Sequence, residues 1–316
     1  MTAFLVVSAA FLGTLVSALA PAPEPAAGGI LGSSVTRVDT TWLGTAVLFL
    51  WAVYAFRRWQ KARRLGPEAA VATDDVALIG AVALLLWELL TSRFHLLPAH
   101  LFPRPVQVVA ALVKDRAVIL GNIASSLGIL AAGYGAAVAL AVPLGLLIGW
   151  RRRLFGAVYP VAKAMAPIPP TVYVPYAITL LPTFWTSSVF VVFAGSFWPI
   201  FMNTLNGVFS VDRRLIDSAR CLGVPERTLL RRVILPGALP SVFGGAMIGL
   251  LSSFIMLTIA EMIGAKSGLG WYIQYFADFA SYDRVTAGIV VVAVVVGLVV
   301  YGFDTLKARL TRWQAA

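Results

Sequence analysis

The chain of 316 residues is 59% apolar and 12% charged, and its mean hydropathy is +0.87. Soluble domains carry about 25% charged residues. This composition excludes a soluble enzyme, a disordered protein and a secreted disulfide scaffold. The single Cys221 also excludes an internal disulfide and a cysteine-based metal cage. The sequence therefore predicts an all-α, polytopic membrane protein.

The net charge of +11 is gathered into short basic clusters between apolar stretches. Such clusters mark cytoplasmic loops, because Lys and Arg near membrane spans resist translocation. They also attract anionic lipid, so their distribution indicates a lipid bilayer and not nucleic acid as the partner. If every apolar stretch spans the membrane, all clusters fall on one side and both termini are cytoplasmic. The clusters lie at 57–64, 151–153, 213–232 and 307–312.

A helix needs about 20 residues to cross a hydrocarbon layer of ~30 Å. Eight stretches qualify: 2–20, 42–56, 76–92, 122–150, 158–181, 186–208, 241–263 and 285–304. The first has an alternative, because Ala18-Leu19-Ala20 resembles the cleavage site of a signal peptide. No Lys or Arg precedes its apolar run, which favours a retained helix.

The chain is expected to divide near residue 70. Residues 57–75 are interpreted as a polar connector that contains Gly66-Pro67 and the acidic pair Asp74-Asp75. An N-terminal appendage, residues 1–75, would then carry two transmembrane helices, and residues 76–316 would carry six. The appendage matches no pattern that we identify. Docking of a further subunit and a sensor role both remain open for it.

The stretch 158–181 is predicted to be a broken helix. Proline removes a backbone donor and blocks regular helix, and non-helical backbone at membrane depth is tolerated only inside protein or beside a water-filled cavity. The break therefore either lines a translocation path or is a packed kink, and the clustering of prolines favours the path. These prolines are Pro160, Pro167, Pro169, Pro170, Pro175 and Pro182.

The longest polar loop, residues 209–240, predicts two short amphipathic helices. Asp212 can cap the first helix, and Gly223 can end it in the left-handed conformation. Pro225 suits the first turn of the second helix, which is expected to end at Pro236. Their apolar faces need a partner, which is either the lipid surface or a cytoplasmic protein. The residues alone favour neither.

This loop resembles the signature of permease subunits of ATP-binding-cassette (ABC) importers, which reads E-A-A, three residues, Gly, nine residues, I-x-L-P. The corresponding residues here are Asp217-Ser218-Ala219, Gly223 and Val233-Ile234-Leu235-Pro236. Further segments are similar to the nitrate/sulfonate/taurine (bicarbonate) branch, namely Trp87-Glu88, Phe197-Trp198-Pro199-Ile200, Glu261-Met262 and Gly268-Leu269-Gly270. The resemblance covers residues 76–313. The branch carries W-F-G-x-G where this chain has 180–184, so the solute stays open.

The resemblance implies a six-helix core like that of type I importers, in a bacterial inner membrane. It implies a homodimer of permeases, cytoplasmic ABC ATPase subunits, and a periplasmic or lipid-anchored solute-binding protein. ATP and Mg²⁺ would be bound by the ATPase, since this chain lacks a G-x-x-x-x-G-K-[ST] motif. We therefore expect no catalytic residue, cofactor or metal in this chain. The implied solute is small and polar, for example nitrate, a sulfonate, taurine or bicarbonate.

The same resemblance assigns ATPase docking to the coupling loop. The candidate docking residues are Leu215, Asp217, Ser218, Ala219, Leu222, Gly223, Val224, Pro225, Leu229, Leu235 and Pro236. Of these, Leu215, Ala219, Leu222, Val224 and Leu229 are expected to supply the apolar contact.

Three ionisable residues in or near apolar spans, Glu88, Lys163 and Glu261, are candidates for the translocation path, because charge there is costly. Each has a structural alternative. Glu88 can pair with a neighbouring helix, Lys163 can extend to the membrane surface, and Glu261 can pin the outer glycine-rich turn. The remaining path candidates are Pro169, Pro170, Thr171, Asn203 and Thr204.

The alternative function is a secondary transporter driven by an ion gradient. Such a protein typically has paired intramembrane carboxylates or broken helices in two corresponding halves. Here one helix is broken and the two glutamates are isolated, which favours the importer. A membrane-embedded enzyme is disfavoured, since no His/Glu or Ser/His set converges.

Overall fold

The structure is a computed structural model that describes Ser8, Val47, Leu50, Trp51, 53–55, 57–58, 67–93, Pro98 and 101–311. These residues form helices joined by short turns, which confirms the predicted all-α class. The chain comprises two compact units. Unit 1 contains 1–119 and 275–289, and unit 2 contains 120–274 and 290–316.

Unit 1 is built around α3 (Pro67–Glu88), which continues as one π-helical turn, η1 (Leu89–Arg93), and α4 (Pro105–Lys114). Trp87 near the end of α3 donates a hydrogen bond from Nε1 to the Pro103 carbonyl at 3.1 Å. Pro105 occupies the first turn of α4, where its missing amide costs nothing. The start of α13 is held here by Arg284, whose Nε lies 2.9 Å from Asp115 Oδ2.

The N-terminal appendage contacts α3 at several of its described residues. Tyr54 donates its hydroxyl to Asp74 Oδ1 at 2.8 Å, and Arg58 Nε lies 2.8 Å from the same oxygen. Val47 and Tyr54 are buried together with Ala81 of α3. Helix α3 begins at Pro67, ahead of the predicted start at 76, and so includes Asp74, whose side chain is buried. The expectation of a polar connector up to residue 75 was wrong at this point, because Asp74 has partners that offset its burial.

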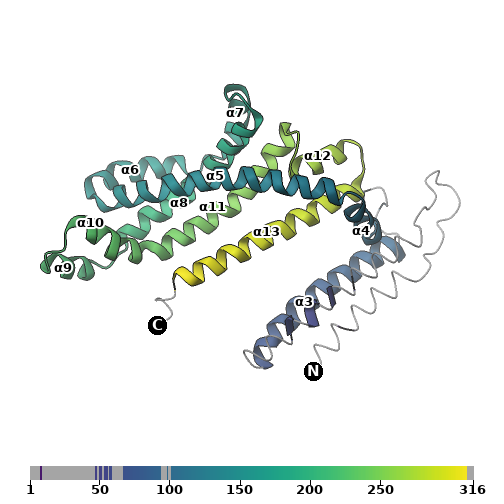
Figure 1. Cartoon of the computed structure of the whole chain (residues 1–316), viewed down its shortest axis with the longest axis horizontal. Helices are drawn as coiled ribbons and strands as arrows, with labels where there is room; N and C mark the ends of the chain where they lie inside the picture. Colours follow the sequence, from purple (N-terminus) through teal and green to yellow (C-terminus); the bar gives the residue numbers. More distant parts are fainter. Residues whose placement is uncertain are drawn as a thin grey trace. The chain divides into compact units, whose positions relative to one another are not determined.

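Unit 2 contains the long helices of the protein (Figure 1). Its elements are α5 (Arg116–Trp150), α6 (Arg152–Met165), η2 (Pro170–Tyr173), α7 (Val174–Leu180), α8 (Phe184–Phe209), α9 (Arg213–Cys221), α10 (Glu226–Leu229), η3 (Leu230–Ile234), α11 (Leu235–Gly264), α12 (Leu269–Asp278) and α13 (Tyr282–Leu310). Of these, α5, α12 and α13 extend into unit 1.

Among the described residues, four helices are long and apolar enough to cross a membrane: Arg116–Trp150, Phe184–Phe209, Glu226–Gly264 and Tyr282–Leu310. They confirm four of the eight predicted stretches. The stretch 76–92 corresponds to a shorter apolar helix, Ala77–Thr91. The first stretch and most of the second lie outside the described residues.

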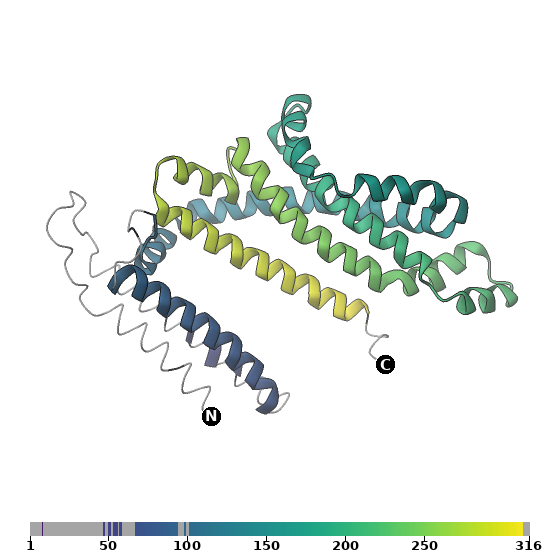
Figure 2. The same cartoon turned by 180° about the vertical axis from the view of Figure 1, so that it is seen from behind.

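The predicted break in the stretch 158–181 is confirmed. Helix α6 ends at Met165, and the chain resumes as the short 3₁₀ helix η2 and then α7. Both views show α6 running beside α8, while α7 projects from the body of unit 2 near the start of α8 (Figures 1 and 2). Val174 and Ala177 of α7 are buried against Val191 of α8 and Ala260 of α11. One face of α6 packs on α5 and α8, with Ala162 buried in the same cluster as Ala137 and Phe201.

Helices α8 and α11 pack closely along their length because glycines remove side chains from the contact. A Cβ on Gly245 would lie 2.5 Å from Asn203 Cβ and 2.9 Å from the Pro199 carbonyl oxygen. A Cβ on Gly249, one turn later, would lie 2.9 Å from Ile200 Cγ1. Small residues four positions apart are a common contact between transmembrane helices.

The second loop helix does not end at Pro236, as the sequence predicted. It passes from α10 through the π-helical turn η3 directly into α11, so that Glu226–Gly264 is one continuous helix. Proline cannot donate to the carbonyl four residues earlier. The π turn just before it changes the hydrogen-bond pattern, with the Leu235 amide donating to the Leu230 carbonyl. The helix therefore continues past Pro236 instead of ending there.

Candidate functional site

The candidate docking site is the loop formed by α9 and α10. Asp212 caps α9 as predicted, because its Oδ1 accepts a hydrogen bond from the Arg214 amide at 2.9 Å. The buried Ala219 and the half-buried Ile216 lie on one face of α9 and pack against Val208 and Val211 at the end of α8. The opposite face is polar and basic, so α9 is amphipathic.

Helix α9 ends in a glycine-dependent turn. Gly223 has φ +69°, which is the left-handed region that favours glycine. The Gly223 amide donates to the Arg220 carbonyl at 2.9 Å, and the Val224 amide donates to the Ala219 carbonyl at 3.1 Å. This pair of bonds is the Schellman motif, which satisfies carbonyls at the end of a helix. The predicted role of Gly223 in ending the helix is confirmed.

The structure separates the candidate docking residues by exposure. Leu222 is 82% exposed and Leu215 is 57% exposed, whereas Ala219 and Leu229 are 8% and 2% exposed. Ala219 and Leu229 pack in the chain's own core, so the expectation that they contact an ATPase directly was wrong. Asp217, Ser218, Gly223 and Pro225 are exposed as well, and Val224, Leu235 and Pro236 are half-buried.

Trp150, at the end of α5, holds the loop from the other side, a contact that no pattern in the sequence indicates. Its Nε1 donates to Glu226 Oε1 at 2.8 Å, and the Arg220 guanidinium lies 5.3 Å from its ring centroid. Trp150 also packs against the apolar cluster beneath α9. One side chain therefore links α5 to both halves of the loop.

Trp150→Ala is expected to release the loop from α5. The change removes a hydrogen bond and a cation–π contact, so tryptic cleavage within 213–232 should become about tenfold faster. Trp150→Phe is the matched control, since it keeps an aromatic ring for Arg220 and removes the bond to Glu226. Equal cleavage rates in Trp150→Ala and the wild type would contradict this role.

The path candidates around the broken helix lie against α8 and α11. Pro170 and Thr171 are half-buried in η2, and Pro170 lies near Gly195 of α8. Pro169 and Lys163 are exposed, Lys163 in the last turn of α6. Their role in the path stays a prediction.

Two polar candidates on α8 bond to their own helix. Thr204 is fully buried and donates to the Ile200 carbonyl at 2.7 Å, and its place on the path stays a prediction. Asn203 donates from Nδ2 to the Pro199 carbonyl at 2.8 Å and is half-buried against Gly245. Such bonds to the carbonyl four residues earlier satisfy polar groups inside apolar helices.

The two glutamates are both buried. Glu88, at the last residue of α3, is 6% exposed, and Glu261 near the end of α11 is 1% exposed. Both carboxylate oxygens of Glu261 accept hydrogen bonds from the chain itself, one from Ser126 and one from the Gly270 amide. The alternative that Glu261 pins the glycine-rich turn is therefore confirmed, and its place on the path stays a prediction.

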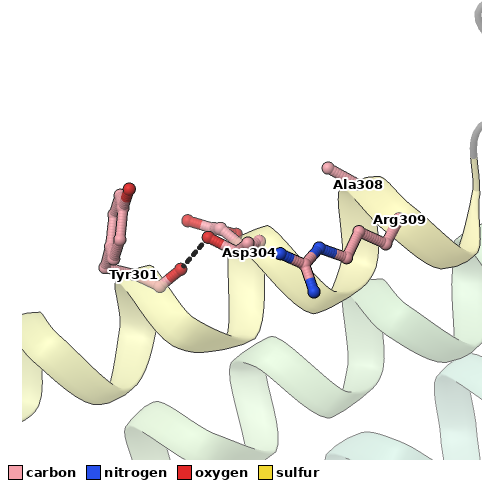
Figure 3. Close-up of a pocket in the computed structure, with 5 residues that line it drawn as sticks. Tyr301, Asp304, Ala308 and Arg309 are labelled. Atoms are coloured by element: carbon pink, nitrogen blue, oxygen red, sulfur yellow. Dashed lines mark hydrogen bonds between the residues drawn. The ribbon is translucent and has the colours of Figure 1, made fainter.

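A surface depression of about 440 Å³ lies over α13 (Figure 3). Its lining residues, Tyr301, Asp304, Thr305, Ala308 and Arg309, are all on one helix. The depression is open, and Thr305 donates to the Tyr301 carbonyl at 2.8 Å within the same helix. It shares no residue with the candidate path or the loop.

Residues 141–314 match the family of binding-protein-dependent transport system inner membrane components. A probable ABC transporter permease protein of Brucella abortus (strain 2308) is 36% identical over 72% of this chain and 90% of its own length. The taurine transport system permease protein TauC of Escherichia coli (strain K12) is 33% identical over 80% of this chain and 95% of its own. The nitrate import permease protein NrtB of Synechocystis sp. is 28% identical over 68% of this chain and 81% of its own length.

A solved structure, that of the inward-facing MetNI methionine ABC transporter, contains a chain with the same fold. The two chains superpose with a TM-score of 0.55 at 19% sequence identity, over 63% of this chain and 98% of that one. The family match and the extent of the similarity to the curated permeases agree with the loop signature at Gly223 and Leu235-Pro236. The chain belongs to the binding-protein-dependent transport system inner membrane components, the permease subunits of ABC importers.

Proposed function

We propose that this chain, with a second copy of itself, forms the translocation pathway of an ATP-driven importer. The loop of α9 and α10 docks onto a cytoplasmic ABC ATPase, and an external binding protein delivers the solute. The chain itself carries out no covalent chemistry, and ATP and Mg²⁺ are held by the ATPase. The observation that carries the proposal is the exposed pair Leu215 and Leu222 on a loop whose other face is fixed in the chain's own core.

The loop is suited to transmit force. Its capped helix, its Schellman turn and its contact with Trp150 make it a rigid projection. Exposed leucines beside polar residues are typical of a protein contact, because they bury apolar area when a partner binds. The basic clusters at 213–232 and 307–312 support a cytoplasmic position for the loop and for the C-terminus.

The solute proposed for the pathway is a small polar compound, with an anion favoured. The curated relatives include permeases for taurine, aliphatic sulfonates and nitrate. Sulfonates and nitrate are small anions, and taurine carries a sulfonate group. Growth of a deletion strain on single sulfur or nitrogen sources, with and without the gene, tests this class directly.

The docking proposal predicts that Leu222→Glu abolishes association with the ATPase. The change places a charge on the most exposed apolar side chain of the loop, where partner contact would desolvate it. The tagged wild-type chain, purified in mild detergent, should retain a P-loop ATPase in stoichiometric amount. The Leu222→Glu variant, purified in the same way, should lack it.

Leu310→Glu is the matched control, because Leu310 is an exposed leucine in the basic end of α13. It should leave the ATPase bound. Retention of the ATPase by Leu222→Glu, or its absence from the wild-type preparation, would reject docking through this loop. Solute uptake that needs an ion gradient and no ATP would point instead to a secondary transporter.

A further inference from the structure

The start of α12 is bound by polar side chains from two other helices. The amides of Gly268, Leu269 and Gly270 donate in turn to Asn122 Oδ1, Ser126 Oγ and Glu261 Oε2, at 2.9, 2.9 and 2.8 Å. These are amides at the beginning of a helix, which have no partner within the helix itself. Side chains of α5 and α11 thus take the place of an N-terminal cap.

Glu261 connects the two sides of this arrangement. Its Oε1 accepts from Ser126 Oγ at 2.7 Å, while its Oε2 accepts from the Gly270 amide. A carboxylate accepts at both oxygens, whereas an amide in its place presents one acceptor and one donor. A negative group at a helix N-terminus is also favoured by the helix dipole. Ser126, Glu261 and the α12 amides therefore form one continuous hydrogen-bonded unit.

The backbone of the turn is shaped to fit around the carboxylate. Gly268 has φ +126°, a conformation that side chains rarely adopt, and a Cβ there would lie 2.3 Å from Glu261 Cδ. A Cβ on Gly270 would lie 2.5 Å from the Thr258 carbonyl oxygen. The two glycines let the turn close directly over Glu261, which leaves this carboxylate 1% exposed.

Apolar packing and an outer hydroxyl pair complete the attachment. Leu269 is buried in the same cluster as Ile129 of α5 and Leu257 of α11. The hydroxyls of Ser125 and Ser267 lie 2.9 Å apart on the exposed side. Together these contacts join the turn after α11 both to α5 and to the end of α11, and all of them lie within unit 2.

We propose that Glu261 is a positioning residue for transport: through Ser126 it locks the turn 265–270 to α5, so that α5, the end of α11 and the start of α12 move as one rigid body. The link to transport rests on the proposed function. The lock itself is a property of this chain alone. The turn lies opposite the coupling loop along the helix Glu226–Gly264, at the end proposed to face outside.

The lock is tested on the purified chain by amide hydrogen exchange. In Glu261→Ala and in Ser126→Ala, the peptide covering 266–272 should exchange about tenfold faster than in the wild type, because each change removes bonds to the amides of Leu269 or Gly270. Glu261→Gln keeps the size of the side chain and one acceptor. Its exchange rate in 266–272 should lie between those of the wild type and Glu261→Ala.

Ser253→Ala is the matched control, since Ser253 is a buried serine of α11 that bonds within its own helix to the Gly249 carbonyl. It should leave the exchange of 266–272 unchanged. If Glu261→Ala does not fold, Ser126→Ala and Glu261→Gln carry the test. Unchanged protection in these variants would overturn the lock.

Rigid-body movement is tested by a covalent substitute for the lock. A chain with Cys221→Ser, Ser125→Cys and Ser267→Cys, assembled with its ATPase, can be oxidised with diamide to join α5 to the turn. Because the two parts are proposed to move together, the oxidised complex should hydrolyse ATP as fast as the reduced one. In the Glu261→Gln background, oxidation should restore the wild-type protection of 266–272.

Two outcomes separate the lock from the proposed function. Loss of ATP hydrolysis on oxidation, reversed by reductant, would show that the turn separates from α5 during the cycle and would overturn the proposal. Failure of any ATPase to assemble with the wild-type chain would count against the proposed function instead. The exchange measurements would still decide whether Glu261 holds the turn.

Discussion

Gly245→Leu is expected to prevent α8 from packing on α11 and to leave little correctly folded protein. A Cβ at this position already lies 2.5 Å from Asn203 Cβ and 2.9 Å from the Pro199 carbonyl oxygen, and the backbone cannot move aside as a side-chain end can. Overpacking typically costs about 1–3 kcal/mol, and a leucine forced against backbone is expected at the upper end of that range. The measurement is the yield of monodisperse protein in detergent together with its thermal unfolding midpoint.

Gly244→Leu provides a control one residue away. A Cβ on Gly244 meets no atom within 4 Å, so leucine there should be accommodated and the unfolding midpoint should stay near that of the wild type. Similar behaviour of the two variants would show that α8 and α11 do not approach each other as described. Gly249→Leu should behave like Gly245→Leu, because its Cβ would lie 2.9 Å from Ile200.

Gly223→Val is expected to weaken ATPase docking without disturbing the membrane helices. The residue has φ +69°, and a Cβ there meets no atom, so the cost comes from the backbone conformation and not from a clash. A left-handed conformation costs an L residue roughly 1–2 kcal/mol, which corresponds to about 5- to 30-fold in an equilibrium. The dissociation constant for the ATPase should rise by that factor, and hydrolysis should become uncoupled from transport.

The matched substitution is Gly156→Val in α6, where a Cβ also meets no atom and the backbone is helical. It should leave docking unchanged. An ATPase affinity that is the same in Gly223→Val and in the wild type would indicate that the Schellman turn is not needed for docking. The thermal unfolding midpoint should be similar in both variants, which separates docking from general stability.

Features set by local chemistry could be predicted from the sequence. The cap at Asp212, the left-handed Gly223 and the break between α6 and η2 each depend on residues a few positions apart. The four long spans follow from apolar composition over about 20 residues. The assignment of Pro236 as a helix end failed for a local reason too, because the π turn η3 lets the helix continue.

Contacts between distant segments could not be predicted from the sequence in the same way. Trp150 and Glu226 are 76 residues apart, and Ser126 and Glu261 are 135 apart. No periodicity in a single sequence indicates such pairs. The same limit applies to Ala219 and Leu229, because their apolar character is compatible with contact to an ATPase and with the chain's own core equally well.

The continuity of α10, η3 and α11 has a mechanical consequence. The helix Glu226–Gly264 has 39 residues, so at 1.5 Å per residue it is ~58 Å long, about twice the hydrocarbon thickness. If this helix tilts as a rigid rod by ~10°, one end is displaced by ~10 Å relative to the other. A small tilt imposed at Glu226 would therefore displace Gly264, on the far side of the bilayer.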